Sequence, residues 1–286
     1  MGDKVRVVEV GPRDGLQNEP RLIPTGQKVY LIDLLSDCGF ETIEAASFVA
    51  PARVPQMADA AEVFGAIRRR PGVRYAALTP NMQGYLRAKA AGADEVAIFG
   101  SASEGFAQKN INCSIAESID RFALVVAAAL TDGIPVRGYV SCVVACPFDG
   151  PTPPATVARL TSVLLRMGCY EVSLGDTIGV GTPATIAAML DAVMEVAPAD
   201  RLAGHYHDTS RTALQNIETS LGRGLRTFDA AVGGLGGCPF APCASGNVAT
   251  GAVIALLQQS GFETGIDAER LAEVSRFAQS LRGYSS

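Results

Sequence analysis

A chain of 286 residues with 48% hydrophobic and 19% charged residues can bury a large core, and this composition excludes a disordered protein. The net charge is −5 and no basic cluster extends beyond Arg68-Arg69-Arg70, which argues against a nucleic-acid-binding protein. The first residues run directly into a strand-like segment without an apolar signal region, and no apolar run is long enough to cross a bilayer. We therefore expect a cytoplasmic protein whose seven cysteines are mostly reduced.

Short apolar, β-branched runs alternate with longer amphipathic segments along the whole chain. The runs, which predict eight strands, are 5–10, 42–46, 74–78, 95–99, 136–141, 171–174, 202–207 and 227–231. The segments with apolar residues at three- and four-residue spacing, which predict helices, include 27–38, 117–130, 155–167, 183–196 and 268–281. Eight repeats of strand and helix predict an α/β fold, a closed (β/α)8 TIM barrel, with an open doubly wound sheet as the alternative. Since no linker-like segment interrupts the pattern, we expect one catalytic domain at 1–286, with a C-terminal helical extension at about 266–282.

Polar residues gather at the ends of the predicted strands. Arg13 and Asp14 follow the first strand, Glu44 lies in the second, and Asp176 follows the sixth. In a (β/α)8 barrel the active site lies in the loops after the carboxyl ends of the strands. Because barrel closure makes the first strand a neighbour of the eighth, we expect residues far apart in the sequence to converge at one mouth.

The chain contains two histidines, His205 and His207, at the end of the seventh predicted strand. Their spacing places both side chains on one face, which favours a metal site over two imidazoles that are simply hydrogen-bonded in the barrel. Asp14 is the natural carboxylate ligand, and Arg13 would offer a positive fork to a substrate oxyanion. Mixed imidazole and oxygen ligands with open positions favour Mg²⁺ or Mn²⁺, although availability could place Zn²⁺, Co²⁺ or Fe²⁺ there.

A glycine-rich loop, GGLGGCPF at 233–240, follows the eighth predicted strand. Its spacing is not the GxGxxG of a dinucleotide-binding turn. Four glycines permit sharp turns and mobility, so the loop is a candidate lid that carries Cys238 to the barrel mouth as a proton donor or nucleophile. An inert small residue is the alternative reading of Cys238, and spacing alone does not decide between the two.

Three motifs give the sequence a family resemblance. They are VEVGPRDGLQNE at 8–19, SLGDTIGVGTP at 173–183, and GGLGGC at 233–238 followed by ASGN at 244–247. In this order they closely resemble the 3-hydroxy-3-methylglutaryl-CoA lyases, and the likeness runs from about residue 4 to residue 282. We therefore expect the fold and chemistry of that family.

The resemblance implies a (β/α)8 barrel and a divalent cation held by an Asp, two His and an Asn, which in this sequence are Asp14, His205, His207 and Asn247. It also implies that Arg13 stabilises an enolate oxygen, that Glu44 supports Arg13 and the metal, and that Cys238 is the catalytic thiol on the lid.

By the same resemblance, the cation would chelate the C3 hydroxyl and an acyl oxygen of 3-hydroxy-3-methylglutaryl-CoA for a retro-Claisen cleavage to acetyl-CoA and acetoacetate. Cys238 would protonate the enolate carbon. His205, Asp14 and a metal-bound water are all options for the group that removes the hydroxyl proton. The implied setting is leucine degradation and ketone body metabolism.

The implied partner is a small acyl-CoA, with no nucleic acid and no membrane. Its CoA moiety needs a basic residue nearby, for which Arg21 and Lys109 are candidates. The residues leave the oligomeric state open, with a homodimer as one option.

The sequence departs from the family pattern near the site without replacing any implied ligand. The departures, which bear on the acyl group, the lid and the support of Asn247, are Ser210, Arg211, Phe240, Pro242, Cys243 and Gly251. One alternative is therefore a lyase for a longer 3-hydroxy-3-alkylglutaryl-CoA. Two others are a Claisen-type synthase that condenses an acyl-CoA with a 2-oxo acid, and a non-catalytic metal-binding barrel.

Overall fold

Eight parallel strands close into a barrel. The structure is a computed structural model that describes residues 3–238 and 241–282, with the side chains of 237–245 outside the description. The barrel strands are β1 (Arg6–Glu9), β2 (Thr42–Ser47), β3 (Arg74–Leu78), β4 (Glu95–Ser101), β5 (Val136–Ser141), β8 (Glu171–Asp176), β9 (Leu202–Tyr206) and β10 (Thr227–Ala230). They are hydrogen-bonded in the order β1-β10-β9-β8-β5-β4-β3-β2. The predicted (β/α)8 barrel is confirmed, and the open sheet is wrong.

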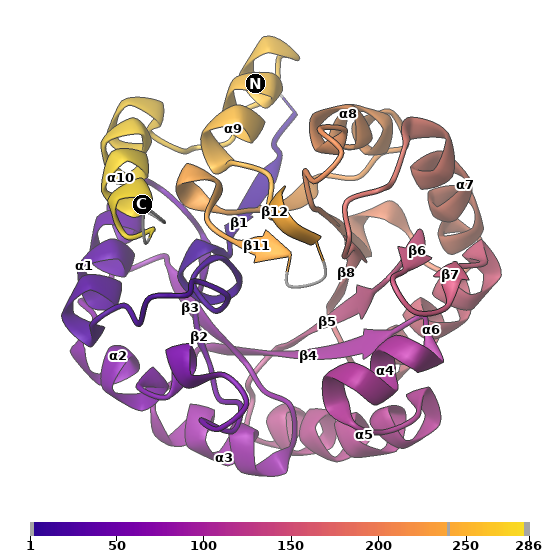
Figure 1. The fold of residues 1–286 in the computed structure, drawn as a ribbon, viewed down its shortest axis with the longest axis horizontal. Helices are drawn as coiled ribbons and strands as arrows, with labels where there is room; N and C mark the ends of the chain where they lie inside the picture. Colours follow the sequence, from indigo (N-terminus) through magenta and orange to yellow (C-terminus); the bar gives the residue numbers. More distant parts are fainter. Residues whose placement is uncertain (1–2, 239–240, 283–286) are drawn as a thin grey trace.

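Helices surround the barrel on the outside (Figure 1). They are α1 (Thr25–Ser36), α2 (Ala60–Ala66), α3 (Met82–Ala90), α4 (Glu104–Ile111), α5 (Ile115–Thr131), α6 (Pro154–Met167), α7 (Pro183–Met194), α8 (Ala213–Gly222), α9 (Thr250–Gln259) and α10 (Ala268–Ser280). Two short hairpins add β6 (Ala145–Cys146) with β7 (Gly150–Pro151), and β11 (Gly237–Cys238) with β12 (Ala241–Ser245). In the described part of the chain, no helix combines the length and apolar character that crossing a membrane requires.

Local chemistry sets the helix boundaries that the periodicity missed. Helix α5 begins two residues before the predicted start because Ser114 forms a capping box: its hydroxyl accepts from the Glu117 amide at 3.2 Å, and the Glu117 carboxylate accepts from the Ser114 amide at 2.7 Å. Helix α1 ends two residues early, ahead of Gly39, whose φ of 96° belongs to the left-handed region.

The closing pair of strands brings the two ends of the barrel sequence together. Strand β1 pairs in parallel with β10, with Arg6 opposite Thr227 and Glu9 opposite Ala230. The turn after β1 and the glycine-rich segment after β10 therefore meet at the carboxyl ends of the strands, beside the β11–β12 hairpin (Figure 1). Helix α10 packs against α1 and the short turn Val232–Gly234.

Apolar side chains fill the layer between strands and helices, whereas the barrel interior is rich in polar groups. Val7, Ile43 and Val172 are fully or almost fully buried in the apolar layer. Inside the barrel, Arg137 and Glu171 are each only 1% exposed. A buried charge needs a partner of opposite sign, so this interior is organised by ion pairs.

Candidate active site

A cavity of about 400 Å³ opens at the carboxyl ends of the strands. One part of its wall is polar and includes Arg13, Asp14, His205 and His207. Another part is apolar and includes Val49, Leu78, Phe99, Phe106 and Ile111. A cavity with this division suits a ligand that has a reactive polar end and an apolar body.

A π-helical turn, Gly11–Gly15, carries Arg13 and Asp14 directly after β1. The buried carboxylate of Glu9 anchors this turn, because its Oε1 accepts from the amides of Gly11 and Val232, each at 2.8 Å. Its Oε2 accepts from the Thr250 hydroxyl at 2.7 Å. A Cβ at position 11 would lie 2.6 Å from Glu9 Oε1, so the close approach requires glycine. Burial raises the pKa of Glu9 to about 7, against the lowering effect of these hydrogen bonds.

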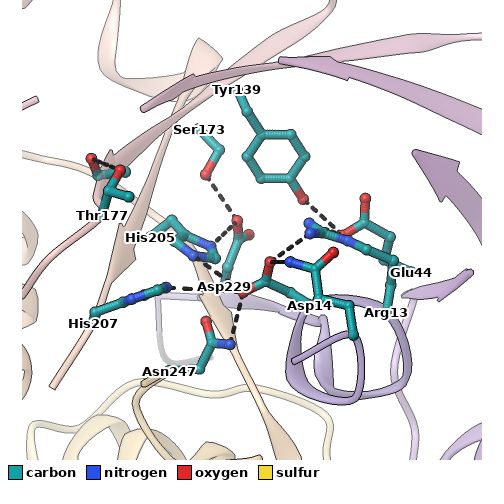
Figure 2. A network of polar contacts seen from close by, with 12 residues as sticks. Arg13, Asp14, Glu44, Tyr139, Ser173, Thr177, His205, His207, Asp229 and Asn247 are labelled. Carbon is teal, nitrogen blue, oxygen red and sulfur yellow. Dashed lines mark hydrogen bonds and ion pairs between the residues drawn. The ribbon is translucent and has the colours of Figure 1, made fainter. Parts of the chain in front are cut away.

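The two imidazoles face the carboxylate of Asp14 (Figure 2). Asp14 Oδ2 lies 3.8 Å from Nε2 of His205 and 3.8 Å from Nε2 of His207. Strand β9 ends at Tyr206, one residue earlier than predicted, and His207 forms an antiparallel bridge with Asn247 instead. The Asn247 amide donates to Asp14 Oδ2 at 2.8 Å.

The structure thus brings together the four residues expected to bind a metal. The donor atoms of Asp14, His205 and His207 lie within 4.8 Å of one another. One carboxylate, two imidazoles and the amide oxygen of Asn247 are a donor set that fits a divalent cation with open positions. Burial raises the pKa of Asp14, but Arg13 and the two imidazoles outweigh it and hold that pKa well below its usual range.

Arg13 is buried and held by two carboxylates. Its Nε and Nη2 donate to Glu44 Oε2 at 2.8 and 2.6 Å, and its Nη1 pairs with Asp14 Oδ1. The hydroxyl of Tyr139 donates to the same Glu44 oxygen at 3.3 Å. Burial raises the pKa of Glu44, while Arg13 opposes this rise. The structure therefore places the Glu44 carboxylate directly against Arg13.

Sequence reasoning missed a second group of residues inside the barrel. Asp229 Oδ2 lies 3.1 Å from Nδ1 of His205 and accepts from the Ser173 hydroxyl at 2.8 Å. Asp229 Oδ1 accepts from Arg137 Nη2 at 2.7 Å. The available signal was Asp229 itself, a charged residue within the predicted strand 227–231, to which the sequence analysis assigned no role.

Other residues that the sequence analysis expected at the site lie outside the described part of the chain or away from the cavity wall. The side chains of Cys238, Pro242 and Cys243, like Phe240 as a whole, lie outside the described residues. Arg53 and Arg121 line the described part of the cavity wall, whereas Arg21 and Lys109 do not.

The departures that the structure does describe lie away from the cavity. Ser210 and Arg211 are exposed, and Arg211 adopts a left-handed φ of 59°. Gly251 is also exposed, and a Cβ added there would meet no atom within 4 Å. These three positions therefore leave the polar cluster unchanged.

Comparisons with known proteins agree with this geometry. Residues 4–278 match the family model described as HMGL-like. A lyase from Pseudomonas aeruginosa, named 3-hydroxy-3-isohexenylglutaryl-CoA/hydroxy-methylglutaryl-CoA lyase, is 52% identical over 99% of this chain and 94% of its own length. The mitochondrial hydroxymethylglutaryl-CoA lyase of Bos taurus is 54% identical over 96% of this chain and 84% of its own.

Among solved structures, an HMG-CoA lyase from Brucella melitensis is 61% identical, with a TM-score of 0.97 and coverage of 98% of this chain and 99% of that one. The predicted resemblance is confirmed over almost the whole chain. The chain belongs to the HMGL-like family.

Proposed function

We propose that this chain is a divalent-metal-dependent carbon–carbon lyase that cleaves 3-hydroxy-3-methylglutaryl-CoA to acetyl-CoA and acetoacetate. The observation that carries the proposal is the position of Asp14, His205 and His207 beside the buried guanidinium of Arg13, at the mouth of one cavity. Near full-length relatives with this activity in their names support it.

The reaction is a retro-Claisen cleavage. The C3 hydroxyl loses its proton, the C2–C3 bond breaks, and C3 becomes the ketone of acetoacetate. The electron pair of the broken bond enters the enolate of acetyl-CoA, which is then protonated on carbon. A divalent cation held by Asp14, His205, His207 and Asn247 would supply Lewis-acid stabilisation to substrate oxygens. Mg²⁺ and Mn²⁺ suit this donor set best.

Arg13 is the group placed to stabilise the enolate oxygen. Three of its contacts go to Glu44 and Asp14, and a guanidinium has five N–H donors, so donors remain for a substrate oxygen. The two carboxylates fix the fork before substrate arrives, which spares reorganisation during the reaction.

Cys238, on the hairpin beside the mouth, is the proposed proton donor to the enolate carbon. Replacement by Ser should then lower turnover sharply, because a hydroxyl is a much weaker acid than a thiol. Mild oxidation should lower activity reversibly if Cys238 pairs with Cys243. Unchanged turnover of Cys238→Ser would count against the role.

The acyl-CoA would extend along the apolar wall. Arg53 and Arg121, both on the cavity wall, are the proposed partners for CoA phosphates. The cytoplasmic location stays a prediction, because the Bos taurus relative is named as mitochondrial. The homodimer and the role in leucine degradation and ketone body metabolism also stay predictions.

A second candidate is a lyase for a longer 3-hydroxy-3-alkylglutaryl-CoA. The relative from Pseudomonas aeruginosa has such a substrate in its name. The apolar side chains of Leu78, Phe99 and Phe106 on the cavity wall offer surface to a longer alkyl group.

One assay separates the candidates. Purified protein with Mg²⁺ or Mn²⁺ should release acetoacetate from 3-hydroxy-3-methylglutaryl-CoA, and His205→Ala or Asp14→Ala should abolish the release. Asp191→Asn is the control, because this exposed carboxylate pairs with Arg223 far from the site. Turnover of a longer analogue alone would support the second candidate, and incorporation of acetyl-CoA into a 2-oxo acid would support the synthase. Cation binding without turnover of any of these would support the non-catalytic barrel.

A further inference from the structure

The second ring nitrogen of His205 faces a buried carboxylate inside the barrel (Figure 2). Nε2 points towards Asp14, while Nδ1 lies 3.1 Å from Asp229 Oδ2. Asp229 is only 2% exposed and comes from β10, the strand next to β9. The imidazole is therefore held between two carboxylates on opposite sides of its ring.

Asp229 is itself fixed by two donors that do not touch the imidazole. Ser173 on β8 donates its hydroxyl to Oδ2 at 2.8 Å, and Arg137 on β5 donates to Oδ1 at 2.7 Å. Ser173 is fully buried and Arg137 is 1% exposed. Donors from β8 and β5 thus fix the position of this carboxylate from across the barrel.

We propose that Asp229 is a positioning residue for His205, which it holds with Nδ1 protonated and Nε2 facing the cation site. An ionised carboxylate only accepts hydrogen bonds, so the ring nitrogen that faces it must carry the proton. A neutral imidazole has a single ring proton, and the lone pair is then left on Nε2. Groups that orient a ligating histidine in this way also raise its basicity.

The inference rests on the cation site of the proposed function but not on the acyl group that is cleaved. Cation binding can be measured without substrate, so the two can fail separately. If the wild-type protein binds no Mn²⁺, both the cation site and this inference fall. If it binds Mn²⁺ but cleaves no acyl-CoA, the proposed function falls alone.

The test is Mn²⁺ titration of Asp229→Asn by calorimetry. An asparagine has one acceptor oxygen, which the charged Arg137 attracts, so its amide N–H would face Nδ1 of His205. This favours the tautomer with the proton on Nε2, so that Nε2 has no lone pair to offer the cation. Mn²⁺ affinity should therefore fall by about 10- to 100-fold. Wild-type affinity in folded Asp229→Asn would overturn the proposal.

The matched control is Glu171→Gln. Glu171 accepts from Arg137 Nε at 2.8 Å and pairs with Arg6, so the variant damages the same buried network without contacting His205. Its Mn²⁺ affinity should stay at the wild-type value, even if thermal unfolding occurs at a lower temperature. An equal loss of affinity in both variants would show a general structural role and would overturn the proposal.

If Asp229→Asn does not fold, the inference can still be tested on protein that retains Asp229. The chain has two histidines, so long-range ¹H–¹⁵N spectra of the Zn²⁺-loaded protein should show two imidazoles, and His207→Ala assigns the one that remains. We expect a protonated Nδ1 on His205. A proton on Nε2, or Zn²⁺ bound through Nδ1, would refute the inference.

Discussion

Two buried polar clusters in the same barrel differ in how their charges are balanced. The floor cluster, Arg6, Arg137 and Glu171, lies towards the amino ends of the strands, and its Arg137 also pairs with Asp229. The mouth cluster, Asp14, His205, His207 and Asn247, lies at the carboxyl ends.

In the floor cluster, guanidinium donors meet carboxylate acceptors of the same chain. In the mouth cluster, a carboxylate oxygen faces two imidazole Nε2 atoms at 3.8 Å, an arrangement that a cation or added protons would complete. The charges of the floor cluster are paired within the chain. In the mouth cluster, Asp14 pairs with Arg13 through Oδ1, while its Oδ2 and the two imidazoles are arranged to receive a cation. We therefore expect substitutions in the floor to change stability, and substitutions in the mouth to change function.

The largest expected effect is on activity, from the mouth cluster. His207→Ala should lower kcat/KM by about 10³-fold or more, because Lewis-acid stabilisation is worth several kcal/mol. The free energy of unfolding of the metal-free protein should change by about 1 kcal/mol or less. Steady-state kinetics measures the change in kcat/KM, and urea denaturation measures the change in the free energy of unfolding. A large loss of stability with retained activity would reverse the comparison.

The next effect is on stability, from the floor cluster. Arg137→Met should lower the free energy of unfolding by about 3–5 kcal/mol, because Asp229 and Glu171 would become uncompensated buried charges. Urea denaturation measures this loss. Arg223→Met is the control, since its partner Asp191 is exposed, and it should leave the midpoint unchanged. Equal effects in both variants would contradict the contrast between buried and exposed pairs.

Glu9 sharpens the comparison because it is a buried carboxylate whose partners are all neutral donors. Its pKa in the folded chain is about 7, whereas its ordinary value is 4.5. Below pH 4.5 both states bind the proton, and stability is then lost as the pH rises towards 7, because the unfolded chain releases its proton first. Relative to Glu9→Gln, the wild-type free energy of unfolding should fall by on the order of 3 kcal/mol across this window.

Denaturation of both proteins between pH 4 and pH 8 checks the sign. A wild-type advantage that grows with pH would mean that Glu9 is stabilised as an anion. In that case the three hydrogen bonds to its carboxylate would outweigh the cost of burial.

The smallest effect tests the link between the clusters. The Tyr139 hydroxyl accepts from Arg137 Nη1 at 2.9 Å and donates to Glu44 at 3.3 Å. Tyr139→Phe should cost about 1 kcal/mol in unfolding free energy and reduce kcat/KM by less than about tenfold. A loss of activity as large as that of His207→Ala would mean that the two clusters act as one unit.

Much of the fold could be predicted because burial leaves a pattern in the chain. Strands at 74–78 and 136–141 agree with the structure to the residue, and all but one residue of each strand is buried. Helix ends were less accurate, because caps such as Ser114 act outside the periodic segment. Whether the chain forms one domain with a helical extension stays a prediction.

The candidate site divides in the same way. The histidine pair, and Arg13 with Asp14, could be singled out because they lie at predicted strand ends, which define the mouth of a barrel. Asn247 entered through the family resemblance alone, because its partner His207 lies 40 positions earlier. Asp229 was missed, because a charged residue within a predicted strand does not show by itself which distant side chains it will contact.

The sequence by itself determined the alternation of strands and helices, the family and the residue types at the mouth, because periodicity and motifs are local properties of the chain. Only the tertiary structure decided which polar groups form hydrogen bonds or ion pairs with each other. Barrel closure sets β10 beside β9 and so places Asp229 against Nδ1 of His205. Such contacts depend on distances between strands, and the order of residues along the chain does not contain them.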